Sequence, residues 1–140
     1  MHEISARIQE LSDKQGLMRL SYLAMNGYPK VVPVWFARVD HFYYVGTEAT
    51  SAKSKAIQRD PRAGWVIDGG ENHRFWGASY SGRLEEVSDT AIKARAYSAL
   101  GEKYFSSSDD PEFVKIYGKV DDPATVYFRL VPETVYSWDY

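Results

Sequence analysis

The chain has 140 residues, of which 44% are hydrophobic and 26% are charged, and its formal net charge is −2. This composition is typical of a globular chain and excludes a largely disordered one, while the sequence pI near 5.9 argues against a dedicated nucleic-acid-binding domain. The absence of cysteine excludes a disulfide framework and a thiolate metal site.

The expected cellular location follows from the absence of a membrane-spanning segment and of a secretion signal in the sequence. The longest apolar run, residues 31–37, is far shorter than the roughly 20 residues of a transmembrane helix, and residues 1–3 lack the basic start of a secretory signal. We therefore expect a cytoplasmic protein that partners neither membranes nor nucleic acids. Aromatic residues reach 15%, and such side chains suit pleated strands, so much of the chain should be β-structure.

The first predicted elements are a helix and a β-hairpin. Ile4, Ile8 and Leu11 recur at the helical period and predict a short amphipathic helix over residues 3–14. From residue 17 the apolar side chains alternate with a period of two, which predicts a strand. The dipeptide Asn26-Gly27 then separates two apolar runs, which is a strong hairpin signal.

The returning strand is predicted over residues 30–38. Residues 31–36 are apolar on both faces, as in a doubly buried strand, and Pro33 leaves part of one edge unpaired because it has no N–H. The remaining expected elements are a strand at 42–45, a loop at 46–50, a helix at 51–60, strands at 63–68 and 75–87 around a loop at 69–74, helices at 89–104 and 111–120, and a strand at 126–130 that breaks at Pro132 and resumes at 135–138.

Consecutive hairpins in this order argue against a parallel α/β sheet. The sequence predicts a mainly β (α+β) fold, a six- to seven-stranded antiparallel split β-barrel with short flanking helices, because curling the sheet protects its edges. No repeat, low-complexity tract or linker divides the chain, so residues 1–140 are expected to form one domain.

Familiar catalytic patterns are absent from the sequence. There is no Gly-x-Ser-x-Gly elbow, no Gly-x-Gly-x-x-Gly after a strand and no phosphate loop ending in Gly-Lys-Ser/Thr. The three histidines, His2, His41 and His73, lack the spacing of metal ligands. We therefore expect neither a metal site nor a catalytic side chain.

The segment over residues 47–62 is the most informative one. A strand ends, and a helix then opens with Thr50 or Ser51 as N-cap and Lys53 in its first turn. The free N–H groups and positive end of such a helix can hold a phosphate. The alternative interpretation is a simple cap with solvated lysines, although a lysine in a first turn opposes the helix dipole unless an anion is present.

Four stretches resemble the pyridoxamine 5′-phosphate oxidase-like family of flavin-binding split β-barrels. They are Val-Val-Pro-Val-Trp-Phe, Phe-Tyr-Tyr-Val-Gly-Thr, the run from Ser51 to Asp68 with its Ser-x-Lys and Asp-Pro-Arg motifs, and Ser-Gly-Arg-Leu-Glu-Glu-Val. The resemblance covers roughly residues 4–138. It implies a homodimer that holds two flavins at the subunit interface, where the partner covers the ring.

The resemblance also implies roles for single residues. Lys53 matches the phosphate lysine and Ser51 the hydroxyl at the helix start, while Ala52 stands where true oxidases carry an arginine. The other positions implied to bind the cofactor are Val32, Pro33, Val34 and Trp35 in a strand that lines the ring and ribityl chain, and Thr47 at the end of the next strand. Trp138, and then Trp76, are the tryptophans expected to reach the ring from the partner subunit.

The resemblance implies an FMN-binding oxidoreductase that moves hydride or electrons to a small acceptor. The flavin supplies the redox chemistry, which fits a chain without catalytic side chains. Alternatives are a reductase using the deazaflavin coenzyme F-420, and a non-catalytic flavin- or haem-binding protein. Residues 129–132 (Arg-Leu-Val-Pro) resemble part of the oxidase substrate segment, but its preceding arginines and histidine are not evident, so classical pyridoxamine phosphate oxidation is not expected.

Overall fold

The structure is a computed structural model that describes residues 4–140, and in that range it contains four helices and seven strands. In chain order they are α1 (Ala6–Asp13), β1 (Met18–Leu23), β2 (Pro29–Val34), β3 (Ala37–Val39), β4 (Phe42–Glu48), α2 (Ala52–Arg59), β5 (Arg62–Glu71), β6 (Arg74–Glu86), α3 (Thr90–Phe105), α4 (Pro111–Tyr117) and β7 (Thr125–Asp139). Residue 3 of the expected first helix, and His2, lie outside the described residues. No helix within this range combines the length and apolar character needed to cross a bilayer.

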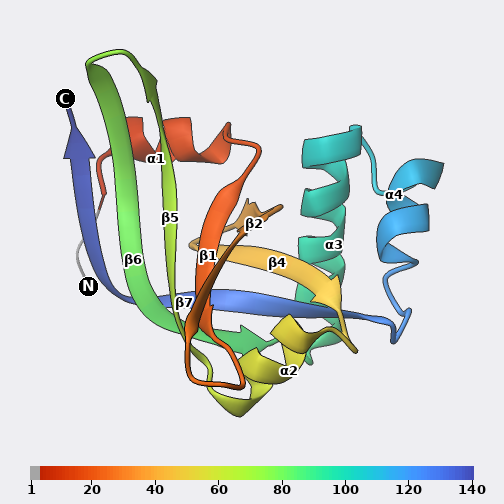
Figure 1. Cartoon of the computed structure of the whole chain (residues 1–140). Coiled ribbons are helices and arrows are strands. Elements are labelled where there is room, and N and C mark those ends of the chain that lie inside the picture. Colours follow the sequence, from red (N-terminus) through yellow and green to blue (C-terminus); the bar gives the residue numbers. More distant parts are fainter. Residues whose placement is uncertain (1–3) are drawn as a thin grey trace.

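All seven strands join one antiparallel sheet in the order β2-β1-β5-β6-β7-β4-β3. The long strands β6 and β7 curve together through the molecule, so that β1 and β5 stand upright in Figure 1 while β4 and the first part of β7 run across them. The sheet thereby curls into a half-barrel. The predicted split-barrel fold class is confirmed.

Strand β7 is one bent strand, although the sequence predicts a break at Pro132. Ser81 pairs with Thr134 and Gly82 with Pro132, so β7 carries one extra residue and bulges at this point. A bulge increases the local bend, and Pro132 needs no partner for an N–H it lacks. A Cβ atom at position 82 would collide with the carbonyl oxygen of Val131, which explains the glycine there.

Two apolar cores lie on the two faces of the curled sheet. The first fills the half-barrel beside α1 and includes Met18, Leu20 and Ile67. The second lies between the sheet and helices α3 and α4, and is built around Leu100 and Phe113. The cores hold the strands in register and leave the loops and the start of α2 on the surface.

The expectation of a doubly buried strand at 31–36 is wrong. Strand β2 is at the end of the sheet and is mostly exposed, and Val31 keeps 67% of its surface accessible. The chain leaves β2 after Val34 and starts the short β3 at Ala37. At this break the hydroxyl of Tyr104 in α3 accepts from the N–H of Phe36 at 3.0 Å, replacing a ladder partner.

Several expected loops are shorter in the structure because strands continue into them. Strand β4 extends to Glu48, and β5 and β6 continue to a tight turn in which Asn72 has a φ of 56°. Helix α4 ends at Tyr117, three residues before the predicted boundary, because Gly118 turns the chain with a φ of 73°.

Candidate functional site

A surface cleft of about 380 Å³ opens at the start of α2, and we call it the α2 cleft. Strands β1, β2 and β4, the first turn of α2, the end of α4 and the start of β7 all contribute to it. Its lining consists of Tyr22, Val32, Thr47, Glu48, Ser51, Lys53, Ile116, Tyr117 and Thr125.

Local hydrogen bonds fix the first turn of α2 beside this cleft. The Ser51 hydroxyl oxygen accepts from the N–H of Ser54 at 3.0 Å, so of the two predicted candidates, Thr50 and Ser51, Ser51 is the N-cap. Strand β4 pairs Thr47 with Val126 and Glu48 with Thr125, which places the end of β4 next to β7. Because the first N–H groups of a helix have no intrahelical acceptor, this turn presents donors and a partial positive charge.

The amine of Lys53 gives the cleft a positive charge. Its side chain is half-buried, and burial lowers the pKa of its amine from the ordinary value, while the charge of nearby Glu48 offsets part of this effect. The desolvated ammonium is therefore incompletely compensated, and an anion bound beside it would stabilise its charged form. Lys55, two residues further along α2, is exposed and does not line the cleft.

Four of the ten predicted cofactor residues meet in the cleft, namely Val32, Thr47, Ser51 and Lys53. Pro33, Val34, Trp35 and Ala52 adjoin them in sequence but are not part of its lining. Val34 is buried in the half-barrel core, and the side chain of Ala52 is exposed. Trp35 instead stacks on Tyr104 of α3, with ring centroids 4.6 Å apart and planes inclined by 12°.

Trp76 and Trp138 lie elsewhere, near the start of β6 and the end of β7, the ends of these strands that stand farthest from α2 in Figure 1. Trp76 packs into the half-barrel core, whereas Trp138 is half-buried and lies against Tyr136, with ring centroids 5.8 Å apart. Neither ring reaches the α2 cleft of its own subunit. Their contact with a cofactor held by a second subunit stays a prediction.

Sequence reasoning did not assign the other lining residues, Tyr22, Glu48, Ile116, Tyr117 and Thr125. Tyr22 could be placed only on the buried face of β1, and Thr125 joins the site only through its pairing with Glu48. Such long-range pairing leaves no local pattern in the sequence.

Among residues 4–140, no three potential ligands of the types His, Cys, Asp or Glu gather closely enough to hold a metal ion.

The comparisons with known proteins agree on the fold. The family model described as Pyridoxamine 5′-phosphate oxidase matches residues 4–139. A conserved hypothetical protein from Mycobacterium tuberculosis superposes with a TM-score of 0.83 at 23% identity, covering 99% of this chain and 86% of that chain. A search of curated protein sequences gives no match.

Two further solved structures share the fold but differ in what they are named for. A FAD-binding protein from Mesorhizobium loti has a TM-score of 0.72 at 22% identity, with 98% of this chain and 96% of that chain covered. The heme storage protein from Vibrio cholerae has a TM-score of 0.74 at 15% identity, with 96% and 94% covered. At such identities the likeness concerns the fold alone.

Proposed function

The chain belongs to the pyridoxamine 5′-phosphate oxidase family, and from this premise we propose that it is an FMN-binding oxidoreductase acting on a small-molecule substrate. The observation that carries the proposal is the half-buried Lys53 amine beside the first turn of α2 in an open cleft. An ammonium and free helix N–H groups together form a site suited to a phosphate.

The residues of the α2 cleft fit the polar parts of FMN. Lys53 would hold the phosphate, and Ser51 can donate its hydroxyl proton because its oxygen already accepts from Ser54. Val32 lies on β2, the end strand of the sheet that residues 4–140 form, so the outward backbone groups of β2 are free to bind the ribityl chain or ring. Ala52 supplies no guanidinium, so the phosphate would depend more strongly on Lys53.

Bound FMN would supply hydride or electron transfer, and the protein would supply binding, orientation and shielding from water. The substrate is proposed to differ from pyridoxamine phosphate. Arg129, in the segment that resembles the oxidase substrate segment, bonds to Glu85 at 3.3 Å, and Leu130 is buried in the half-barrel core. Neither residue lines the α2 cleft.

We further propose that the chain is a homodimer in which the partner covers the flavin. One subunit leaves the cleft open, with Ile116 at its margin still 55% exposed. A second subunit lying over this margin would bury the apolar surface and exclude water from the ring. Trp138 is the residue that we expect the partner to contribute first, because Trp76 is only 7% exposed.

Titration of the protein with FMN and with riboflavin tests this proposal. A hydrogen bond to a charged group contributes about 1.5–3 kcal/mol, so Lys53→Ala should weaken FMN binding by about ten- to a hundredfold. Riboflavin lacks the phosphate, and its affinity should change little. Ser51→Ala should cost less, and part of its effect would come from the lost helix cap.

Lys55→Ala is the matched control, because it removes the same charge from an exposed position on the same helix. Its effect on FMN affinity should be limited to a screened long-range interaction. Equal losses for FMN and riboflavin in Lys53→Ala, or no loss for either, would refute the phosphate site. Mass spectrometry of the molecule released on denaturation would distinguish FMN from the deazaflavin coenzyme F-420.

A further inference from the structure

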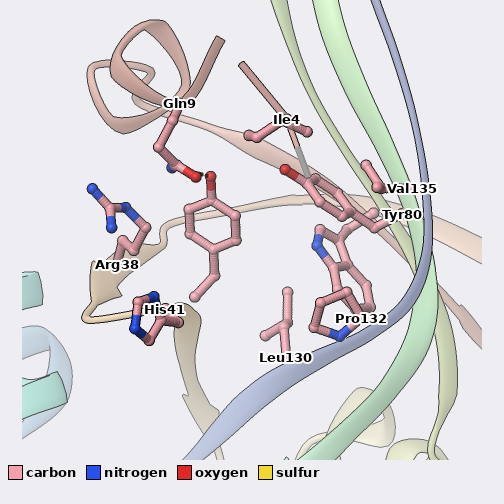
Figure 2. A pocket seen from close by; sticks show the side chains of 10 residues that line it. Ile4, Gln9, Arg38, His41, Tyr80, Leu130, Pro132 and Val135 are labelled. Atoms are coloured by element: carbon pink, nitrogen blue, oxygen red, sulfur yellow. Dashed lines mark hydrogen bonds between the residues drawn. The ribbon is translucent and has the colours of Figure 1, made fainter. Parts of the chain in front are cut away.

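A second hollow lies at the open end of the half-barrel, away from the α2 cleft. Figure 2 shows this barrel-mouth pocket, with side chains from α1, β6 and β7 around one space of about 280 Å³. Its lining consists of Ile4, Gln9, Arg38, His41, Tyr43, Trp65, Tyr80, Leu130, Pro132 and Val135. It shares no lining residue with the α2 cleft.

The bend of β7 accounts for the existence of the pocket. The bulge between Ser81 and Gly82 and the adjacent Pro132 turn β7 at the level of Tyr80. Leu130 and Val135 therefore lie on opposite sides of the bend, and both line the space beneath α1. In a regular strand, residues five positions apart face opposite sides of the sheet, but the extra residue of the bulge turns both side chains toward the same space.

Most of the lining is aromatic or aliphatic. Trp65 stacks on Tyr80, with ring centroids 5.6 Å apart and planes inclined by 16°, and together they form a flat wall. Cavities of about 150 Å³ with apolar walls bind benzene in other proteins. The barrel-mouth pocket is therefore large enough for a substituted aromatic ring.

The pocket contains hydrogen-bond donors that have no acceptor among residues 4–140. Gln9 donates to the hydroxyl oxygen of Tyr43 at 2.9 Å, and the hydroxyl group of Tyr80 lies in the same pocket. Tyr43 only accepts in this contact, and neither O–H proton of the two tyrosines is used in a hydrogen bond among residues 4–140, so both hydroxyls can donate to a ligand. The Nε1–H of Trp65 is also buried and has no partner among residues 4–140.

The charged residues at the rim favour a neutral ligand. Among residues 4–140, no carboxylate is part of the lining. The Arg38 guanidinium donates to Asp13 at 2.7 and 3.0 Å and to the carbonyl oxygen of Asp40 at 2.7 Å, so its charge is already compensated. A charged ligand would lose its hydration without gaining a free counter-ion.

We propose that the barrel-mouth pocket binds a neutral, single-ring aromatic molecule whose oxygen accepts a hydrogen bond from the Tyr43–Tyr80 hydroxyl pair. The ring lies against Trp65, and the pocket acts independently of the flavin site. The ligand class is an aryl ketone, aldehyde or amide, because these combine a flat apolar body with one acceptor.

Two probes of the same shape test the hydrogen bond. Acetophenone carries a carbonyl oxygen where α-methylstyrene carries a CH₂ group. In the full-length protein, acetophenone should bind at least about fivefold more tightly than α-methylstyrene, which corresponds to a net hydrogen bond of about 1 kcal/mol. The double change Tyr43→Phe and Tyr80→Phe keeps the aromatic ring at position 80 stacked on Trp65 and should abolish this difference by weakening acetophenone binding alone.

The location is tested on the unaltered protein by nuclear magnetic resonance. Acetophenone should shift the indole N–H signal of Trp65, which is identified by its loss in Trp65→Phe. Val135→Phe should fill the pocket and remove the binding of both probes while leaving FMN affinity unchanged. A Trp65 signal that does not move, equal affinities of the two probes, or undiminished binding to a folded Val135→Phe protein would overturn the proposal.

Discussion

Single residues set the charge balance of the α2 cleft. Lys53 and Glu48 place opposite charges on one lining, and burial lowers the pKa of the lysine more than the carboxylate raises it. Glu48 is exposed, so water and salt screen its effect on the amine. It would still repel a phosphate bound beside Lys53.

Replacing Glu48 should therefore strengthen phosphate binding. Exposed charge pairs contribute about 0.2–1 kcal/mol, so Glu48→Gln should tighten FMN binding by up to about fivefold at low salt. Riboflavin affinity should stay the same, and the gain should disappear in concentrated salt. Fluorescence titrations at several salt concentrations measure both effects. Glu133→Gln, at an exposed position on β7, is the control, and an equal gain there would contradict the assignment.

The sequence predicted the local structure at the start of α2. Ser51 was placed as a cap and Lys53 in a first turn because helix starts are encoded within a few residues. Thr125 could not be predicted, since only the pairing of β4 with the distant β7 brings it to the cleft. Trp35 stacks on Tyr104, a partner sixty-nine positions away in the sequence.

At the scale of elements, the last turn of α3 supports the break between β2 and β3. The hydroxyl of Tyr104 bonds to the N–H of Phe36, and the Nζ atom of Lys103 lies 3.4 Å from the centre of the Phe36 ring. Burial lowers the pKa of Lys103 to about 8, against a small opposite effect from Asp13. The ring face of Phe36 favours the charged amine and limits this shift.

The lowered pKa of Lys103 predicts a pH dependence of stability. Between about pH 8 and the ordinary value of 10.5, the unfolded chain binds a proton that the folded chain has lost. The free energy of unfolding should therefore rise with pH through this window. Chemical denaturation should show this rise for the unaltered protein relative to Lys103→Met.

Raised tyrosine pKa values act in the opposite direction at higher pH, but they affect both proteins equally and cancel in the comparison. Lys115→Met removes an exposed lysine from α4 and should leave the pH dependence as it was. If the curves of the unaltered protein and of Lys103→Met stay parallel from pH 7 to 10.5, the amine of Lys103 is not desolvated in solution.

Element types were predicted more successfully than element ends and burial. Alternation predicted β1 correctly, with Met18, Leu20 and Tyr22 on its buried face. The apolar run at 31–36 was misjudged because burial depends on the place of a strand in the sheet, and β2 is an edge strand. The continuity of β7 past Pro132 depends on a bulge that only its pairing with β6 defines.

For the whole molecule, the placement of exposed apolar residues indicates where a second subunit would bind. Val31 on the edge strand β2 points to the face opposite to that of Val32 in the cleft lining, and Ile116 lies at the cleft margin. Both are largely exposed, as is Tyr28 at the start of the same hairpin arm. Exposed apolar side chains along an edge strand and at the margin of a site are typical of an interaction surface.

We therefore expect a homodimer that covers the α2 cleft, with one subunit related to the other by a twofold axis. Light scattering at micromolar concentration should give twice the chain mass of 16.0 kDa.

Val31→Lys places a charge in the proposed interface and should raise the dimer dissociation constant by at least about tenfold, as expected for a buried charge without a partner. Because the partner covers the flavin, the same change should weaken FMN binding at low protein concentration, and excess protein should restore it. Val31→Ile keeps the surface apolar and should behave as the unaltered chain. A mass of 16.0 kDa at every concentration would show that the chain works as a monomer.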